Sequence, residues 1–406
     1  MGTLRLLGGA SSLGDHMSTT PMPASTSTPV RRHQPRLTSI QSMRGIAALL
    51  VLVTHAAGIA VTGNRASSWF TLTGLFGFDN FGAIGVDLFF IISGFVMAYA
   101  VAPKAGLKPA VDFLVMRWVR VAPPYLLASI VMLAVGMLVV HGYWGVRSFF
   151  NLAFFVPWLD TAYYSVPPLY IGWTLSFEVS FYLLVALMVA VRLSQKITWL
   201  AGGIVVMVVL GQCLPNSPFI VRWFTNPILL EFALGIVAYV LWKSGLLMRR
   251  RWAWAVAGVI GGAVLVPQAL SGTIPMAKME FIVDNSLSLQ RVMMWGLPMF
   301  FIFLSVLAFD RVRSGRLSYL SAKLGDASYS LYLAHIPAIL GLTVVLGLVP
   351  FTIAPDAVFI LCIAVGLLAC FLYYRHVERP MKTYLEHRAA SLLLGDGRMA
   401  RRPVQR

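Results

Sequence analysis

Arg44 and His55 lie eleven positions apart in an apolar stretch. An arginine side chain can bind an anion, and a histidine side chain can transfer a proton. On a helix this separation is a rotation of about 1100°, so both side chains project from one face to within ~20°. The rise between them is about 16 Å, roughly half of the hydrocarbon layer. This strip suits a ligand with an anionic head near Arg44 and a thin reactive arm near His55. The spacing alone equally allows a snorkelling arginine and a hydrogen-bonded packing histidine.

A second basic pair, Arg117 and Arg120, precedes another apolar stretch. At i,i+3 spacing on a helix, the two side chains can reach a common target. The planar guanidinium pairs well with phosphate oxygens. With Lys104 and Lys108 nearby, the pair predicts a phosphate site; ordinary positive charge beside a membrane is the alternative reading.

Other ionisable side chains lie within apolar segments: Asp87, Glu178, Glu231 and His335. Such residues are costly in a membrane, so each is a functional hypothesis. Polar side chains repeat at helical spacing in two stripes: Thr174, Glu178 and Tyr182, and Ser328, Tyr332 and His335. Stripes on several helices predict one internal, wetted cavity. A cavity of this kind fits proton transfer, and it also fits ion-coupled transport.

The composition of the chain indicates that these residues belong to a membrane protein. Hydrophobic residues make up 58% of the 406 residues and charged residues only 12%, whereas a soluble domain has about 25% charged residues. We therefore predict an all-α, polytopic transmembrane bundle of about ten helices. The predicted spans are 44–62, 84–102, 121–140, 168–191, 198–213, 228–242, 252–270, 290–308, 327–347 and 355–374.

The net charge of +17 is distributed unevenly between the predicted loops. Five of the 32 Lys and Arg residues fall in alternate, outer segments: Arg65, Arg147, Arg222, Lys278 and Arg291. This asymmetry is the positive-inside pattern, and it predicts that both termini are cytoplasmic. The basicity is thus topological, with attraction to anionic membrane lipid, and we expect no nucleic-acid partner. Cys213, Cys362 and Cys370 have no metal-ligand spacing, so no metal site is expected.

Ordered motifs resemble those of the integral membrane acyltransferase-3 family, which O-acylates polysaccharides, lipopolysaccharide and related acceptors. The segments that carry the resemblance are Ser39–Ala48 with His55, Gly85–Phe95, Phe113–Pro123, Trp173–Glu178, Leu230–Phe232, Leu324–His335 and Val377–Pro380. Each block is weak alone, but their order and the intact Arg44/His55 spacing are specific. The segments Ile40–Gln41 and Gly172–Leu175 are most similar to the exopolysaccharide acetyltransferase branch.

The resemblance implies an acyl-CoA donor, usually acetyl-CoA, bound on the cytoplasmic side. By the matching motifs, Arg44, Arg117 and Arg120 would hold the CoA phosphates, and His55 would be the catalytic base or a transient acyl carrier. This assignment agrees with the anion-to-imidazole strip derived from spacing.

We expect two further groups of residues to support the reaction. Glu178 or Asp87 would orient the His55 imidazole or receive a proton. Ser93, Tyr332 and His335 are the candidates for donating hydrogen bonds to the developing oxyanion.

The resulting hypothesis is a multi-pass inner-membrane O-acyltransferase that acts on a hydroxyl of a cell-surface or secreted glycan. A small glycosylated, macrolide-like acceptor is one alternative, and an ion-coupled transporter or flippase is another. The predicted organisation is a disordered tail over 1–36, a transmembrane acyltransferase domain over 37–385 and a basic cytoplasmic tail over 386–406.

Overall fold

A computed structural model describes the chain over ten stretches, and within them regular structure is entirely helical. The described residues are 37–62, 81–101, 105–139, 146–155, 164–193, 196–270, 275–310, 316–348, 350 and 353–394. The predicted disordered tail, 1–36, and Lys104 lie outside these residues.

Nine helical segments of the described chain are long and apolar enough to cross a membrane. They are Thr38–Ala60, Ile84–Val101, Leu107–Met137, Gly172–Ala190, Phe219–Lys243, Arg251–Ala269, Ser288–Ala308, Ser328–Gly347 and Pro355–Leu385. The span predicted at 198–213 is a shorter apolar helix, Ile197–Gln212, about 24 Å long at 1.5 Å per residue. The prediction of an all-α, polytopic bundle of about ten helices is confirmed.

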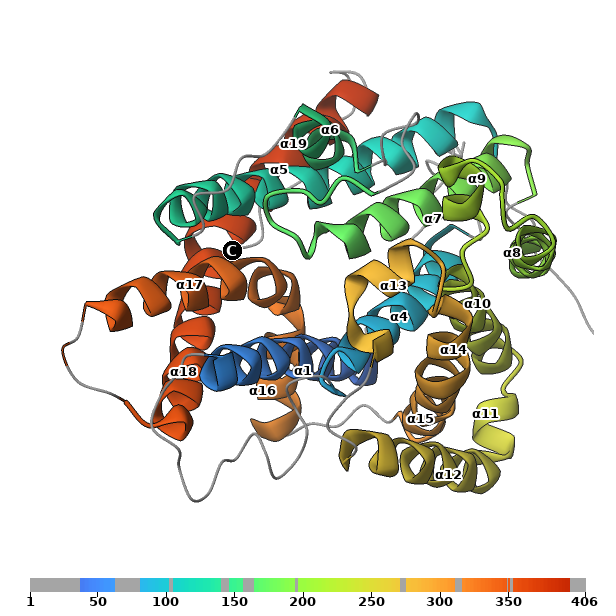
Figure 1. Cartoon of the computed structure of the whole chain (residues 1–406). Coiled ribbons are helices and arrows are strands. Elements are labelled where there is room, and N and C mark those ends of the chain that lie inside the picture. Colours follow the sequence, from blue (N-terminus) through green and yellow to red (C-terminus); the bar gives the residue numbers. More distant parts are fainter. Residues whose placement is uncertain are drawn as a thin grey trace, which may run out of the picture. The chain divides into compact units, whose positions relative to one another are not determined.

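The helix that carries Arg44 and His55, α1 (Thr38–Thr62), packs against helices from both ends of the described chain. Its neighbours are α4 (Ile84–Val101), α16 (Arg316–Asp326), α17 (Ser328–Gly347) and α18 (Pro355–Tyr373). Figure 1 shows α1 and α4 in the middle of the bundle, with α17 and α18 at the left. The α1–α17 contact brings the His55 and His335 segments together.

On its other side, α4 packs most extensively against α10 (Leu229–Lys243). Two glycines permit the close approach: a Cβ at Gly94 would lie 2.1 Å from the Phe232 carbonyl oxygen, and one at Gly235 would lie 2.1 Å from the Ile91 oxygen. Any side chain at either position would push the two helices apart. This contact holds the buried polar residues of α4 against α10.

Helices α5 (Leu107–Val139) and α7 (Gly172–Ala190) pack together and lie across the top of Figure 1. The last helix, α19 (Arg379–Leu394), packs along α5 and follows a π-helical turn, η4 (Tyr374–Glu378). The basic tail predicted from position 386 therefore begins within α19, because the helical pattern continues beyond the apolar span. Residues 395–406 lie outside the described residues.

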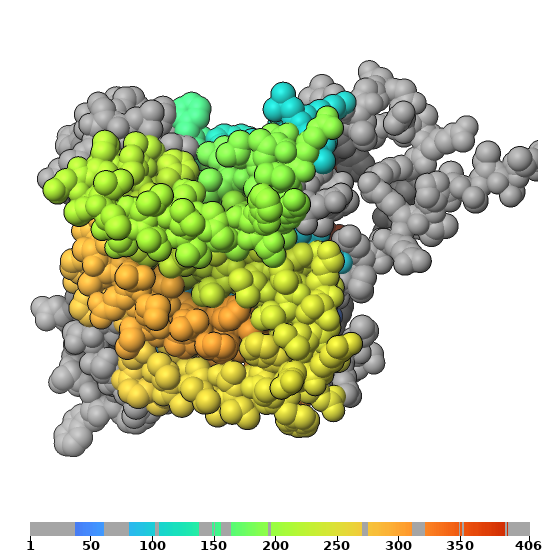
Figure 2. Space-filling view, turned by 90° about the vertical axis from the view of Figure 1, so that its right-hand side faces the viewer, coloured from blue at the N-terminus to red at the C-terminus, as the bar shows by residue number. Residues whose placement is uncertain are grey.

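The short helix α6 (Val146–Phe154) packs against α5. The remaining elements complete the side of the molecule around α4 and α10. They are α8 (Ile197–Gln212), α9 (Phe219–Phe224), α11 (Leu246–Arg249), α12 (Arg251–Leu270), η2 (Pro275–Ala277), α13 (Met279–Val283), α14 (Ser288–Arg291), the π-helical η3 (Val292–Gly296) and α15 (Leu297–Ala308). In the face shown in Figure 2, the yellow band along the bottom is α12. Its side chains Val256, Val259 and Ile260 are more than half exposed, as a surface that contacts lipid tails would be.

Candidate active site

Three arginines predicted from separate motifs converge on one cavity, which we call the arginine cavity. Arg44 comes from α1, and Arg117 and Arg120 come from α5. The other polar residues that line it are Ser93, Thr174, Glu178, Tyr182, Ser328, Tyr329 and Tyr332. Residues such as Phe90 and Met97 form apolar walls, so the arginine cavity combines apolar walls with cationic side chains.

Glu178 provides the carboxylate of the arginine cavity. Its Oε1 accepts hydrogen bonds from Ser93 Oγ at 3.1 Å and from the Tyr182 hydroxyl at 2.5 Å. Arg117 stacks its guanidinium over the Tyr182 ring at 5.7 Å. Glu178 therefore lies in a hydrogen-bonded network beside the arginines, and its formal charge offsets only one of their three.

A second cavity, the histidine cavity, has His55 in its wall. Its other polar and aromatic lining residues are Thr54, Tyr170, Trp173, Lys278, Glu280, Arg291 and Tyr332. The Tyr170 ring meets the His55 ring edge-on, with centroids 5.6 Å apart. Lys278 and Glu280 are exposed, so charged side chains line the part of this cavity that faces solvent.

The two cavities share Val86 and Tyr332 in their linings, whereas the sequence predicted a single cavity. The Tyr332 hydroxyl lies 2.7 Å from Thr174 Oγ1 and 3.2 Å from the Ile171 carbonyl oxygen, and these bonds hold the ring in place. Sequence periodicity placed Tyr332 on an interior face, but it could not show that the side chain would divide that interior.

His55 is in direct contact with His335, which lies 280 positions later in the chain. His55 Nδ1 is 2.8 Å from the Val51 carbonyl oxygen and 3.2 Å from His335 Nε2. His335 Nδ1 lies 2.8 Å from the Leu331 carbonyl oxygen. A carboxylate was expected to orient His55; in the structure the orienting contacts come from a carbonyl and a second imidazole.

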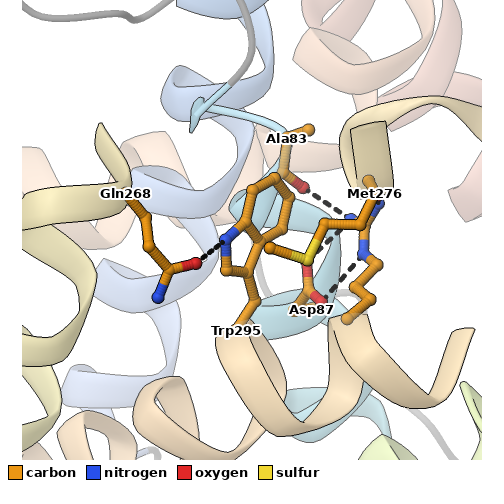
Figure 3. Close-up of polar contacts among 6 residues, drawn as sticks. Ala83, Asp87, Gln268, Met276 and Trp295 are labelled. Carbon is orange, nitrogen blue, oxygen red and sulfur yellow. Dashed lines mark hydrogen bonds and ion pairs between the residues drawn. The ribbon is translucent and has the colours of Figure 1, made fainter. Parts of the chain in front are cut away.

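Asp87 pairs with Arg291, a residue that sequence analysis assigned to an outer loop. Arg291 Nε and Nη2 donate to the two Asp87 carboxylate oxygens at 3.0 and 2.7 Å, and both side chains are wholly buried. The same guanidinium donates to the Met276 and Ala83 carbonyl oxygens (Figure 3). It also lies over the Trp295 ring at 4.9 Å. A buried aspartate needs a cation, and that need was the available signal for Arg291.

Glu231 is a second buried acidic residue near this pair. The side chain is inaccessible to solvent, and its Oε1 lies where a Cβ at Gly296 would come within 2.7 Å. Glycine at position 296 of η3 therefore leaves space for the carboxyl group. Glu231 lines neither of the two cavities.

The structure thus brings most of the predicted site residues together, but in two groups. The residues in the arginine cavity are Arg44, Ser93, Arg117, Arg120, Glu178 and Tyr332. His55 faces the histidine cavity with His335 behind it. Asp87 belongs to neither lining and is paired with Arg291, which does line the histidine cavity.

Removing one member of the Asp87–Arg291 pair is expected to destabilise the protein strongly. Asp87→Asn leaves a buried guanidinium without its counter-charge, at a cost of about 3–5 kcal/mol. We expect the thermal unfolding midpoint of the purified protein in detergent to fall markedly. The double variant Asp87→Asn/Arg291→Gln should recover part of that loss, because it leaves no buried guanidinium without its counter-charge. A double variant less stable than both single variants would contradict the pairing.

Comparison with known proteins identifies the family. A family model described as "Acyltransferase domain" matches residues 37–375. The chain is 28% identical over 308 residues to "Exopolysaccharide production protein ExoZ" of Rhizobium meliloti (strain 1021), covering 74% of this chain and 89% of that protein. It is 26% identical over 331 residues to "Acyltransferase MdmB" of Streptomyces mycarofaciens, covering 74% of this chain and 78% of that protein.

No solved structure matches the chain. The family model covers the segments that hold Arg44, His55, both α5 arginines and His335, so the cavities described above lie within the matched region. The chain belongs to the membrane-integral acyltransferase-3 family, and the protein is a membrane acyltransferase.

Proposed function

We propose that the protein transfers an acyl group, acetyl in the first instance, from acyl-CoA in the arginine cavity to a glycan hydroxyl in the histidine cavity. The observation that carries this proposal is the meeting of the two cavities at Tyr332 and Val86. The arginine cavity is cationic and the histidine cavity contains an imidazole. Because the two cavities adjoin, an acyl group bound in the first lies next to an acceptor bound in the second.

The lining of the arginine cavity fits acyl-CoA as the donor. Guanidinium groups pair with phosphate oxygens through charge-assisted hydrogen bonds, and Arg44, Arg117 and Arg120 provide three of them. The apolar walls beyond them suit the long neutral arm that carries the thioester. In the proposed orientation this cavity opens to the cytoplasm, as the positive-inside pattern of the sequence predicts.

His55 is the proposed base in the acyl transfer. Its Nε2 takes the proton of an acceptor hydroxyl while the hydroxyl oxygen attacks the thioester carbonyl carbon. A carbon–oxygen bond forms, the carbon–sulfur bond breaks, and the proton passes from His55 to the departing CoA thiolate. The products are an O-acyl ester and free CoA, so His55 returns to its starting form.

The oxyanion formed during the attack needs a hydrogen-bond donor, and Tyr332 lies at the junction where it would form. Tyr332 has one hydroxyl proton, and its present partners are Thr174 Oγ1 and the Ile171 carbonyl oxygen. To donate a hydrogen bond to the oxyanion, Tyr332 therefore gives up its hydrogen bond to one of these partners. Ser93 donates its one hydroxyl proton to Glu178, so it would have to give up that bond to serve the oxyanion.

The acceptor side of the proposal rests on the histidine cavity and on one relative. Tyr170 offers an aromatic ring beside His55, and exposed Lys278 and Glu280 offer hydrogen-bonding groups. Aromatic faces and polar side chains together suit a sugar. The name of the ExoZ relative links that protein to exopolysaccharide production, which supports a cell-surface or secreted glycan as acceptor. The proposed location is the inner membrane.

The proposal predicts acetyl transfer with a fixed sidedness. Purified protein in liposomes should consume radiolabelled acetyl-CoA and transfer the label to isolated cell-envelope glycans, with release of free CoA. When all protein molecules face the same way in the liposome membrane, acetyl-CoA should support acetyl transfer from one side only. That side is the one to which the arginine cavity opens. No consumption with any glycan fraction, together with glycan uptake in the absence of acetyl-CoA, would support the transporter alternative.

A further inference from the structure

The geometry of the two histidines points to a specific role for His335. We infer that His335 is a positioning residue, which together with the Val51 carbonyl accepts the hydrogen of His55 Nδ1 and so leaves His55 Nε2 as the unprotonated nitrogen toward the histidine cavity. This inference rests on the proposed function of His55 as a base. It replaces the expectation that His335 donates a hydrogen bond to the oxyanion.

The protons of His335 follow from its partners. A carbonyl oxygen has no proton to give, so the 2.8 Å contact of His335 Nδ1 with the Leu331 carbonyl requires a hydrogen on Nδ1. The side chain is inaccessible to solvent, so a second proton on Nε2 would bury a charge. In the neutral ring, Nε2 is therefore a lone pair, and it lies 3.2 Å from His55 Nδ1.

The same accounting fixes the tautomer of His55. Its Nδ1 faces two acceptors, the Val51 carbonyl oxygen at 2.8 Å and His335 Nε2 at 3.2 Å. A lone pair on Nδ1 would repel both of them, so Nδ1 carries the hydrogen and shares it between them. A neutral His55 then has its lone pair on Nε2, for which the described residues provide no hydrogen-bond partner.

The contact also favours the charged state through which a base must pass. When Nε2 takes a proton, the hydrogen on Nδ1 becomes more acidic, and its bonds to Val51 and His335 strengthen. A carboxylate in this position would have to be buried within the bundle at a high cost. An imidazole provides the acceptor without that cost, and it is held in place by its own bond to Leu331.

His335 does not line the histidine cavity, whereas His55 does. A residue that touched the oxyanion would have to point an N–H into the reacting space. Nδ1 of His335 instead points to a backbone carbonyl, and Nε2 points to His55. The kinetic consequence is an effect on turnover with little effect on binding of acyl-CoA.

Substitution of His335 tests the role by kinetics. His335→Phe keeps a ring but removes the acceptor, and we expect kcat for acetyl transfer to fall about 10- to 100-fold, as when a functional histidine loses its outer hydrogen-bond partner. KM for acetyl-CoA should stay within about twofold, because the arginine cavity is intact. His335→Gln, whose amide oxygen can accept the bond, should restore part of the rate. His376→Phe, on exposed η4, is the matched control and should behave as wild type.

A second measurement needs no substrate, so it separates this inference from the proposed function. Nitrogen-15 NMR of labelled histidine, with the His55 signals assigned from a His55→Gln sample, reports which ring nitrogen carries the hydrogen. The wild type should show His55 protonated on Nδ1. His335→Phe should keep this tautomer, because the Val51 carbonyl still accepts the hydrogen, but its Nδ1 resonance should shift on loss of the second acceptor. A wild-type His55 protonated on Nε2, or unchanged kcat in a folded His335→Phe variant, would overturn the inference. Inactive wild type with the expected spectrum would overturn only the proposed function.

Discussion

Replacing His55 by Ala is expected to lower kcat for acetyl transfer by about 10²- to 10⁴-fold, the range that a positioned acid–base group contributes. The variant loses the nitrogen that accepts the acceptor's proton, while the arginine cavity keeps its lining. Binding of acetyl-CoA should therefore be preserved. The measurement is the initial rate of label transfer to glycan, beside the affinity for acetyl-CoA measured by calorimetry.

The control for this prediction is another histidine of the described chain. His376→Ala removes an exposed imidazole from η4 and should leave the rate unchanged. Equal expression and a monodisperse elution profile would show that the His55 variant is folded. A His55→Ala protein that transfers acetyl at the normal rate would remove His55 from the mechanism. Loss of acetyl-CoA binding in the variant would mean that His55 acts on the donor.

Replacing Arg117 and Arg120 together by Ala is expected to raise KM for acetyl-CoA by about 100-fold or more. One hydrogen bond to a charged group contributes about 1.5–3 kcal/mol, and each 1.4 kcal/mol is tenfold in affinity. Both side chains line the arginine cavity, so a ligand bound there would lose its contacts with both. The rate at saturating acetyl-CoA should fall much less, because His55 lies in the other cavity.

Arg249→Ala with Arg250→Ala is the matched control for removal of positive charge. Both residues are exposed, at the C-terminal end of α11, and neither lines the arginine cavity. The control should leave KM for acetyl-CoA unchanged. If both double variants raised KM equally, the effect would be one of general surface charge, and Arg117 and Arg120 would be topological signals only. Ionic strength gives a further check, since charge-based binding weakens as salt rises.

The sequence alone determined the class of protein, most of its helices and the family. Apolar runs about 20 residues long predict spans because the thickness of the bilayer fixes the length that a helix needs. The span predicted at 198–213 matches the helix Ile197–Gln212 to within one residue at each end, but at 16 residues this helix is shorter than a typical span. The Arg44/His55 strip needed only helical geometry, and both side chains do line cavities.

The tertiary structure decided which polar residues face one another. Asp87 and Arg291 are 204 positions apart, and His55 and His335 are 280 positions apart. Helical periodicity assigns a residue to a face of its own helix, but it does not say which helix covers that face. The packing of η3, which directly follows Arg291, against α4 and the packing of α1 against α17 made those choices. As a result Asp87 holds an arginine instead of His55, and Tyr332 separates the arginine cavity from the histidine cavity, because side-chain partners follow from packing between helices and not from local pattern.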